Sequence, residues 1–583
     1  MKRFRIYFYL LASFAMILGC SEDFLEKEPL SELSPSAFFN KAADLELFVN
    51  SFYPMFPGTG IYNGDNTTDN IIQSGLTELQ SGARTVPASG GGWTWSYLRD
   101  INYFLAHCEQ CTDPSAVQHY SGVARWFRAY FYFEKVKRFG DVPWYSAVLD
   151  AGDEEIYKAR DPRAMIVDSI LMDLDYAIAN ISSTKEVARI TKWTALALKS
   201  RVCLYEGTLR KYHGGSGADE LLTMSAEAAK EVMDNSGYSI YAGSGVNSGY
   251  HELFCAHDAI ESEIILARQY SAETGVEHDL NYYLMTSSYG MPGMSKSMVN
   301  TYLMADGQRF TDKENYNEIG FPEETIGRDP RLAQTIRTPG YVREGESIES
   351  APQIAYATTG YHIHKYLTEK EYDNFGRSIT DLPLFRFAEV LLNYAEAKAE
   401  LGTLTQSDLD ESIQLLRNRV GMPALNLSEA NGNPDPFLAN QYPNVTGSNQ
   451  GVILEIRRER RVETFMEDLR WDDIIRWKVG PIITQPFRGM YFPGPGDYDL
   501  NADGITDVVL YLDSKPDSEA SATYLKIGEN ITLTEGTSGM IIPHPGANDI
   551  RTFDESRDYL FPIPTTELVL NTNLEQNPNW PDQ

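Results

Sequence analysis

The sequence predicts a mostly α-helical protein in which packed helices support a loop-rich subdomain containing short β-strands. Apolar residues recur every three or four positions over several long stretches, which is the spacing of one helix face. Two other stretches, 236–380 and 479–583, are rich in turn-forming residues and lack that spacing. Because 583 residues are too many for one simple core, we expect at least two closely packed subdomains.

The first 19 residues are expected to direct export. Three basic residues precede an apolar segment that ends at Leu18, which is shorter than the roughly 20 residues of a membrane span. The segment Ile17–Cys20 resembles the bacterial lipobox, in which the cysteine is acylated and becomes the first residue. The sequence thus predicts a lipoprotein signal peptide over 1–19 and a lipid anchor on Cys20, with a plain secretory signal as the alternative. Residues 24–40 are predicted to form an extended tether.

Residues 20–235 are predicted to form an N-terminal helical region. A first helix is expected from Ala42 to Tyr53, and a second runs from about 117 until the DVP turn. A third helix follows Pro162, and its mate is expected over 191–207, where small residues in the stripe allow close approach. The expected buried stripes are Val123, Trp126, Phe127, Tyr130, Phe131 and Phe133, then Ile166, Ile170, Leu174, Ala177 and Ile178, then Trp193, Leu196, Ala197, Ser200 and Leu204.

Residues 236–583 are predicted to form a second region, in which a helical scaffold over 381–478 separates the two loop-rich stretches. Helices are expected at 383–402, 407–420 and 450–477. Antiparallel helix pairs with large aromatic residues opposite alanines resemble tetratricopeptide-like hairpins. The strict 34-residue period of that repeat is absent, so the repeats are degenerate.

Composition excludes some partners. The formal net charge of −32 argues against nucleic acid and against an anionic bilayer surface. Five cysteines are few for an exported chain, so disulfides are not the main framework. His107, Cys108 and Cys111 suggest a zinc or redox site, but no second CxxC follows, and packed thiols or a local disulfide are the alternatives.

The segment DYDLNADGITD predicts a structural Ca²⁺ loop. Oxygen-bearing side chains alternate and then converge through Gly504, as calcium requires. Position twelve is Leu510 instead of the glutamate of an EF-hand, and a strand is expected to follow, so a solvated Asp/Asn turn is the alternative. The predicted calcium ligands are Asp499, Asn501, Asp503, Ile505 and Asp507.

The stretch from 456 to 477 carries glutamates at helical spacing, Glu459, Glu463 and Glu467. Two of them could form a glycosidase acid and base only if their carboxyls faced each other across a cleft, about 5 to 9 Å apart. An ion-pair network that fixes helix packing, with Arg460 and Arg470 as the cations, explains them more simply. The sequence contains no convincing Ser-His-Asp, HExxH, Walker or GxGxxG motif.

Two aromatic loops are candidates for ligand contact. Three glycines precede Trp93 and Trp95, where an aromatic pair can present flat faces to a sugar ring. We expect Trp93 on the surface and Trp95 in the core. A second loop, rich in methionine and glycine, carries Tyr282, Tyr283 and Tyr289, and the alternative is that two of the three pack inward.

Six segments, taken in order, resemble the SusD/RagB family of surface lipoproteins of Bacteroidetes, and the resemblance covers the whole chain. The segments are the lipobox followed by CSEDFLEKEP, then TKWTALALKSRVCLYEGTLRKYHG, RDPRL, LFRFAEVLLNYAEAKAELG, ERRVETFMEDLRWDDIIRW and YLFPIPTTELVLNTNLEQNPNW. Acidic residues after the acylated cysteine, Ser21-Glu22-Asp23, also resemble the export signal that sends such lipoproteins to the outer face.

This resemblance implies four tetratricopeptide-like hairpins that support a loop-rich ligand face. It implies no catalytic activity, binding of oligosaccharide or in some members peptide, and a role as a hinged lid on a SusC-like TonB-dependent barrel. It places ligand-binding residues at Trp93 or Trp95 and at Tyr282, Tyr283 and Tyr289. Arg84 and Asp69 are expected to supply hydrogen bonds to sugar hydroxyls.

Three functions are therefore weighed. The first is a non-enzymatic glycan-binding lipoprotein, anchored in the outer membrane and facing the cell exterior, that delivers nutrient to its transporter. The second is an outer-membrane glycoside hydrolase. The third is a helical-repeat scaffold that binds only protein.

Overall fold

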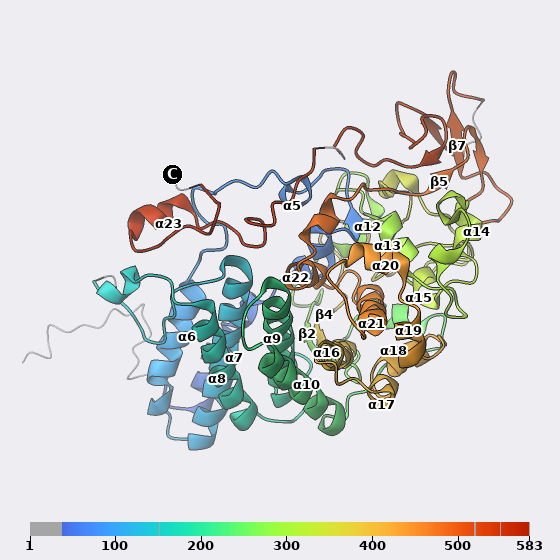
Figure 1. Ribbon diagram of the computed structural model, residues 1–583. Coiled ribbons are helices and arrows are strands. Elements are labelled where there is room, and N and C mark those ends of the chain that lie inside the picture. The colour runs from blue at the N-terminus through green and yellow to red at the C-terminus, as the bar shows by residue number, and fades with distance from the viewer. Residues whose placement is uncertain (1–37, 151, 518–520, 548–549, 582–583) are drawn as a thin grey trace, which may run out of the picture.

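The computed structural model describes residues 38–581, apart from 151, 518–520 and 548–549, and it is mostly helical (Figure 1). The predicted signal peptide and Cys20 lie outside the described residues. The helices of seven residues or more are α3 (Ala42–Asn50), α6 (Ser96–His107), α7 (Pro114–Phe139), α8 (Arg163–Asn180), α9 (Lys192–His213), α10 (Ala218–Asn235), α11 (Gly249–Cys255), α16 (Phe387–Glu400), α18 (Ile413–Arg419), α21 (Gln450–Glu463) and α22 (Arg470–Arg476). The shorter helices are α4 (Gly60–Asn63), α5 (Glu78–Ser81), α12 (Leu280–Met285), α13 (Lys296–Thr301), α14 (Phe321–Thr325), α15 (Pro330–Ala333), α17 (Gln406–Asp410), α19 (Leu427–Gly432), α20 (Pro436–Gln441) and α23 (Thr565–Leu570).

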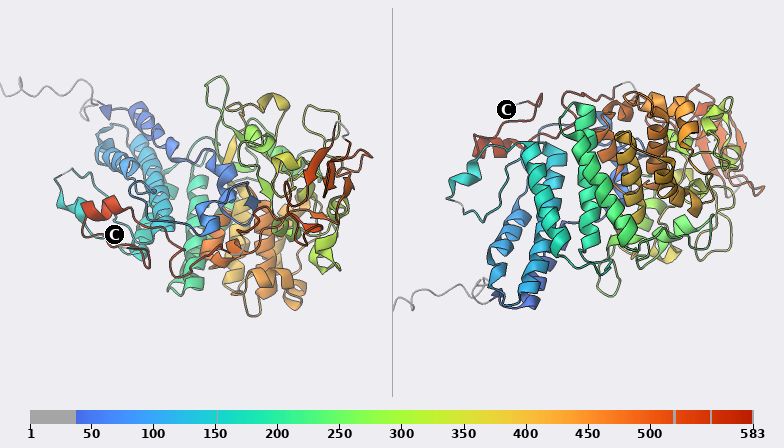
Figure 2. Two further views of the ribbon diagram at one scale, coloured as in Figure 1. Left: turned by 90° about the horizontal axis from the view of Figure 1, so that it is seen from above. Right: turned by 60° about the horizontal axis from the view of Figure 1, so that its bottom comes forward.

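The long helices form a row in which each one packs against the next. Helix α7 packs on α8, α8 on α9, α9 on α10, α10 on α16, and α16 on α21. Figure 2 shows α7 to α10 side by side along one face of the molecule. The expected stripes are buried in this row, except that Ile178 is only half-buried. The prediction of a mostly helical, hairpin-based scaffold is confirmed.

Local sequence explains where these helices begin and end. At the start of α7, the Asp113 carboxylate accepts hydrogen bonds from two backbone amides, and Pro114 takes the first helical position. The helix stops at Gly140, which has a φ of 73°. Helix α9 begins with a capping box between Thr191 and Thr194 and ends at the left-handed Gly214.

Two expected helices are interrupted. The helix predicted over 407–420 is divided into α17 and α18, and the helix predicted over 450–477 is divided into α21 and α22. In the second case Met466 and Asp468 adopt left-handed φ values of 62° and 58°. Because neither residue is a glycine or proline, the break carried no local signal.

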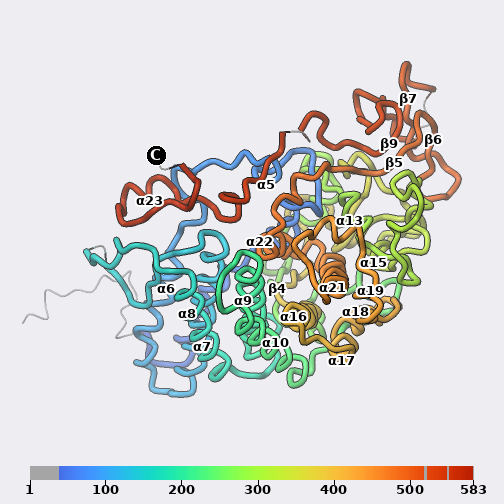
Figure 3. The backbone as a smooth tube through the Cα atoms, in the orientation of Figure 1, coloured from blue at the N-terminus to red at the C-terminus, as the bar shows by residue number. Residues whose placement is uncertain are grey.

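In the described part of the chain the strands are short and form four small sheets, and several of them lie together at the upper right of the backbone trace in Figure 3. Strand β1 pairs with β3, β2 with β4, and β5 with β9, all antiparallel, while β6, β7 and β8 form a three-stranded sheet in which β7 and β8 are parallel. The short strands expected beside loops are thus present. The strands are β1 (Ile71–Ile72), β2 (Ile264–Arg268), β3 (Gly293–Met294), β4 (Leu382–Arg386), β5 (Tyr491–Phe492), β6 (Gly496–Tyr498), β7 (Val508–Tyr511), β8 (Thr523–Lys526) and β9 (Gly539–Met540).

Two hydrophobic cores meet along α21. One core contains the helical row and reaches α22 and Ile563, and the other lies among the loops and strands from Ile61 to Ile541. Helix α21 contributes Leu454 to the first core and Val462 to the second. It therefore joins the helical scaffold to the loop-rich part. Among the described residues, no helix is both long and apolar enough to cross a membrane.

Buried ion pairs fill the junction at the C-terminal end of α21. Glu463 is paired with Arg331, Arg386 and Arg419, and its side chain has no solvent exposure. The predicted ion-pair network is therefore present. Its cations were predicted wrongly, because Arg460 pairs with Asp473 and Arg470 pairs with Asp69. The partners of Glu459 and Glu467 likewise come from distant segments, namely Arg331, Arg417, Arg386 and Lys365.

The cysteines in the described residues are free thiols, and all of them are buried. Cys108 lies in a short 3-10 turn after α6, and burial raises the pKa of its thiol to about 11. A raised pKa disfavours the thiolate that metals and redox partners need. The packed-thiol alternative therefore describes Cys108 and Cys111, and within the described chain no three His, Cys, Asp or Glu side chains gather as a metal site.

Candidate ligand-binding site

Trp93 and Trp95 line a cavity of about 480 Å³ between the start of α6, the loop at 143–157 and the C-terminal α23. Trp93 is only 6% exposed and packs edge to face on Phe139, with ring centroids 4.9 Å apart. The expectation of a surface role for Trp93 is therefore wrong. Trp95, which was expected in the core, is half-buried at its edge, where it packs on Phe131 and Tyr145.

Contacts from α7 explain why Trp93 folds inward. The glycine-rich turn before it exposes carbonyl oxygens, and Arg138 Nε donates to the Gly91 carbonyl at 2.7 Å. Lys135 Nζ donates to the Gly92 carbonyl in the same way. At Gly92, where φ is 89°, an added Cβ would lie 2.8 Å from Arg138 Nε, so glycine permits this close approach. The turn is thus fixed rather than flexible.

The second aromatic loop places two of its three tyrosines at the surface. Tyr283 is 2% exposed, and its hydroxyl donates to Asn66 Oδ1 at 2.6 Å. Tyr282 is half-buried and Tyr289 is 37% exposed, with ring centroids 5.8 Å apart. Phe375, which was not among the predicted residues, is 66% exposed and meets the Tyr282 ring at 90°, with the ring centroids 5.6 Å apart. We call Tyr282, Tyr289 and Phe375 the aromatic platform.

Hydroxyl groups border this platform. Tyr282 Oη and Ser288 Oγ lie 3.0 Å apart, and Thr286 Oγ1 lies 3.0 Å from the same serine. Behind it, the Asp279 carboxylate accepts a hydrogen bond from the Gly376 amide at 2.8 Å and holds the Phe375 turn against α12. The result is a set of apolar rings with hydrogen-bonding groups at their edge.

Arg84 does not border a ligand surface. It is 8% exposed, its guanidinium pairs with the Asp558 carboxylate at 2.8 Å, and it lies over the rings of Phe561 and Trp580. Arg84 therefore holds the C-terminal segment against the N-terminal region. The expectation that it bonds to sugar hydroxyls is wrong because the guanidinium is buried, with its flat face covered by these rings and Nη2 bonded to Asp558.

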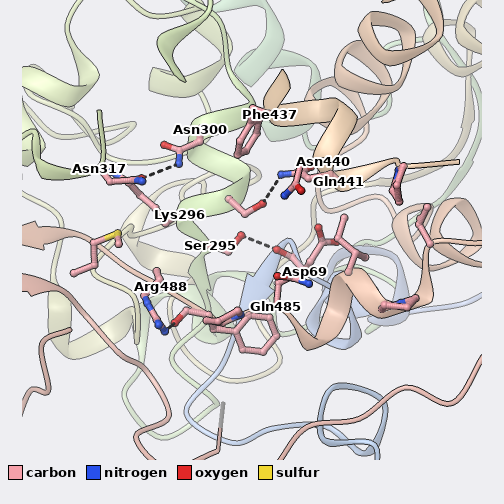
Figure 4. Close-up of a pocket in the computed structure, with 18 of the residues that line it drawn as sticks. Asp69, Ser295, Lys296, Asn300, Asn317, Phe437, Asn440, Gln441, Gln485 and Arg488 are labelled. Carbon is pink, nitrogen blue, oxygen red and sulfur yellow. Dashed lines mark hydrogen bonds between the residues drawn. The ribbon is translucent and has the colours of Figure 1, made fainter. Parts of the chain in front are cut away.

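Asp69 lines a different cavity, of about 580 Å³ (Figure 4), and its carboxylate is already paired with two arginines. Its oxygens lie 2.7 Å from Arg461 and 2.8 Å from Arg470. Burial alone would raise the pKa of this carboxyl, but Arg461 and Arg470 lower it to about 2. The charged carboxylate fixes the floor of the cavity and has little remaining capacity to bind a sugar hydroxyl.

The seven predicted contact residues thus lie in four separate places. Trp93 and Trp95 line the first cavity, which we call the Trp cavity, and the three tyrosines lie in or beneath the aromatic platform. Arg84 is buried against the C-terminal segment, and Asp69 forms the floor of the second cavity, of about 580 Å³. The sequence prediction missed Phe375 and the amide side chains of that second cavity. Phe375 had a usable signal, since the turn DNFGR presents one aromatic residue among polar ones.

The predicted calcium loop has the hydrogen bonding of an Asp/Asn turn. Backbone amides donate to its carboxylates, including Gly504 N to Asp499 at 2.7 Å and Leu500 N to Asp507 at 2.8 Å. Burial and the neighbouring carboxylates of Asp503 and Asp499 raise the pKa of Asp507. The strand expected after it is β7. Calcium binding by Asp499, Asn501, Asp503, Ile505 and Asp507 stays a prediction.

Two family models match the chain. The SusD family matches residues 262–580, which is more than half of the sequence, and a family described as starch-binding associating with outer membrane matches residues 23–204. SusD-like protein P2 of Formosa agariphila is 24% identical over 99% of both chains. A SusD-like protein of Bacteroides ovatus is 24% identical over 97% of this chain and 96% of its own.

Solved structures share the fold. A SusD-like protein of Bacteroides fragilis superposes with a TM-score of 0.69 at 22% identity, covering 94% of this chain and 99% of that one. A SusD-like carbohydrate-binding protein of the same species gives 0.68 at 21% identity, covering 92% and 100%. A laminarin-binding SusD-like protein gives 0.55 at 16% identity, covering 93% and 100%. Because the SusD family model matches more than half of the sequence, the chain belongs to the SusD family.

Proposed function

We propose that this protein is a non-enzymatic, surface-exposed lipoprotein that binds glycan and delivers it to a SusC-like TonB-dependent transporter. The observation that carries the proposal is the aromatic platform, where Phe375 and Tyr289 remain exposed beside Tyr282. The descriptions of two of its structural neighbours as carbohydrate-binding and laminarin-binding support a glycan as the ligand.

The platform suits a flat, hydroxylated ligand. Fully burying a phenylalanine side chain is worth about 1.5–3 kcal/mol, so covering the 66% of Phe375 that is exposed contributes about 1–2 kcal/mol. Sugar rings have apolar C–H faces that can cover aromatic rings, and their hydroxyls can bond to Tyr282, Ser288 and Thr286 at the edge. The rings are tilted by 42° and 90° to each other, which suits a curved chain better than a single flat ring.

Affinity electrophoresis against a panel of polysaccharides, followed by calorimetry with the polysaccharide that is retained, tests this proposal. We expect the triple variant Tyr282→Ala, Tyr289→Ala and Phe375→Ala to lose retention. Ile348→Ala is the matched control, because Ile348 is 77% exposed and lies outside the platform. Retention that survives the triple variant but is lost in Tyr157→Ala would move the binding surface to the Trp cavity, which Tyr157 lines.

The same purified protein separates the alternatives. Release of reducing sugar from a retained polysaccharide would refute the non-enzymatic role. The buried pairing of Glu459 and Glu463 with arginines supports that role, since it leaves neither carboxylate facing a cleft. Binding of peptides without any glycan would shift the ligand class, and co-purification of a barrel without any soluble ligand would favour a protein-binding scaffold.

Anchoring and delivery have their own test. The lipobox and the family description that mentions the outer membrane support a lipid on Cys20. Cys20→Ser should abolish incorporation of labelled fatty acid and release the protein from the outer membrane. Crosslinking in intact cells should capture a TonB-dependent barrel with the wild-type protein, and its absence would refute delivery to such a transporter.

A further inference from the structure

We propose that the cavity floored by Asp69 is a second carbohydrate site, which takes a sugar unit bearing an anionic group such as a carboxylate or sulfate. The inference rests on the proposed glycan-binding function and adds the chemical class of the sugar. The cavity lies between α13, α20 and the segment 478–488, with a volume of about 580 Å³ (Figure 4). This is within the roughly 300–1,000 Å³ range of small-molecule sites.

Carboxamides dominate the polar lining of this cavity. They both donate and accept hydrogen bonds, which suits ligands rich in hydroxyl groups. Asn440 and Gln485 are exposed at its mouth, and the rings of Phe437 and Tyr316 are half-buried beside them. The carboxamides that line the cavity are Asn300, Asn317, Asn440, Gln441 and Gln485.

Asn300 has an unmet hydrogen-bonding requirement. It is 4% exposed, and its Nδ2 donates to Asn317 Oδ1 at 3.3 Å, but its Oδ1 has no partner among the described residues. If the oxygen and nitrogen of the Asn300 amide were assigned the other way round, the buried atom without a partner would be the NH₂ donor instead of the oxygen. A buried polar atom without a partner is costly. A ligand hydroxyl that reaches Asn300 Oδ1 would supply the missing donor.

The charge of the lining is opposite to that of the chain. Its basic residues are Lys296, Lys478 and Arg488, and its acidic residues are Asp69 and Glu555. The single negative charge of Asp69 faces two positive charges, on Arg461 and Arg470, and Lys296 is paired with Glu324. Within the lining, Glu555 offsets only one of the two remaining cations, Lys478 and Arg488. The cavity is therefore positive in a chain with a formal net charge of −32, which favours an anionic group on the ligand.

The backbone at Lys478 points to a role for its side chain. Helix α22 ends in a Schellman motif, in which Val479 N donates to the Ile474 carbonyl and Lys478 N to the Ile475 carbonyl, both at 3.1 Å. The left-handed position of this motif is usually glycine, but here Lys478 takes it with a φ of 54°. The Asn444 amide holds this turn by donating to the Trp477 and Lys478 carbonyls, so the backbone is fixed while the exposed Lys478 side chain stays available at the rim of the cavity for an anionic ligand.

Ligand-observed NMR titration of the full mature protein tests the inference. The probes are glucuronic and galacturonic acid, glucose 6-sulfate and galactose 6-sulfate, and neutral glucose and galactose. We expect at least one anionic probe to bind more tightly than its neutral counterpart, and Lys478→Gly to weaken it about threefold to tenfold. The carboxylate and sulfate arms show which anionic group is preferred.

Controls separate the ligand effect from folding. Lys478→Gly removes the unfavourable φ, so its thermal unfolding temperature should equal or exceed that of the wild type. Ala502→Gly, which relieves a φ of 61° away from the cavity, should behave likewise without changing probe affinity. Asn300→Ala should weaken anionic and neutral probes alike.

The inference is overturned if no anionic probe binds more tightly than its neutral counterpart, or if Lys478→Gly leaves their ratio unchanged. Binding of an acidic peptide at Lys478 without binding of any sugar would also overturn it. Retention of polysaccharide on the aromatic platform is measured separately, so the proposed function can stand when this inference fails.

Discussion

Removing Arg386 should destabilise the protein far more than removing an exposed arginine. Arg386 is 2% exposed and its guanidinium contacts Glu467 at 2.6 Å, Glu463 at 2.7 Å and Glu263 at 3.0 Å. Arg386→Met keeps much of the volume but leaves one uncompensated negative charge at the junction of the two cores. Breaking a buried pair in this way costs about 3–5 kcal/mol in free energy of unfolding.

The cost should depend on pH. Burial raises the pKa of Glu263, and Arg419 and Arg386 only partly oppose this rise. In Arg386→Met the pKa rises further, so the folded state binds a proton more readily than the unfolded state. A group with a raised folded-state pKa stabilises the protein at low pH and loses that contribution as pH rises through the folded pKa. The destabilisation should therefore be smaller at pH 5 than at pH 8.

Urea denaturation followed by tryptophan fluorescence measures both effects, since Trp126 and Trp477 are fully buried in the helical core. Arg377→Met is the matched control, because Arg377 is 63% exposed and lies 3.7 Å from Glu277. An exposed pair of this kind is worth about 0–1 kcal/mol. Equal costs for the two variants, or a cost for Arg386→Met that is the same at both pH values, would refute the reasoning.

Three further predictions concern close packing, the C-terminal segment and calcium. Gly451→Ala would place a Cβ 1.8 Å from the Ala430 carbonyl oxygen, so we expect a loss of about 1–3 kcal/mol or more in urea denaturation, and an unchanged midpoint would contradict the packing of α19 on α21. Arg84→Ala should speed limited proteolysis within 553–580, because the ion pair to Asp558 and both ring contacts are lost. Equal cleavage rates in the variant and the wild type would mean that Arg84 does not hold this segment. Calcium added to chelated protein should raise the unfolding temperature, by an amount equivalent to about 2.7 kcal/mol when the free calcium concentration is a hundred times Kd. Asp499→Asn should remove this rise, and no shift in the wild type would refute the calcium prediction.

Helices with strong local signals could be predicted, and those shaped by distant partners could not. Helix α7 has a capping aspartate, a proline at its first position and a terminating glycine, all readable in sequence. The break between α21 and α22 has no such signal. There the chain turns at Met466 and Asp468, while Lys365 bonds to the Phe465 carbonyl and the Asp65 carboxylate accepts from the Met466 amide.

The same distinction applies to the candidate sites. A glycine-rich stretch before Trp93 predicts a free loop, but Arg138 and Lys135 from α7 bond to its carbonyls and turn the ring inward. The lining of the second cavity comes from seven separate parts of the chain, so no local motif could predict it. Its carboxamides are individually unremarkable in sequence, and only their convergence above Asp69 indicates a ligand.

The pairing of charges explains how an acidic protein can keep a positive cavity. An unpaired buried charge is costly, and the interior matches most of its buried arginines to carboxylates, as Arg386 and Arg331 show. At the floor of the second cavity the match is uneven, because one carboxylate, Asp69, serves both Arg461 and Arg470. That local excess of positive charge adds to the charge of Lys478 at the rim. A ligand with an anionic group completes the pairing that the fold leaves unfinished, whereas a neutral sugar does not.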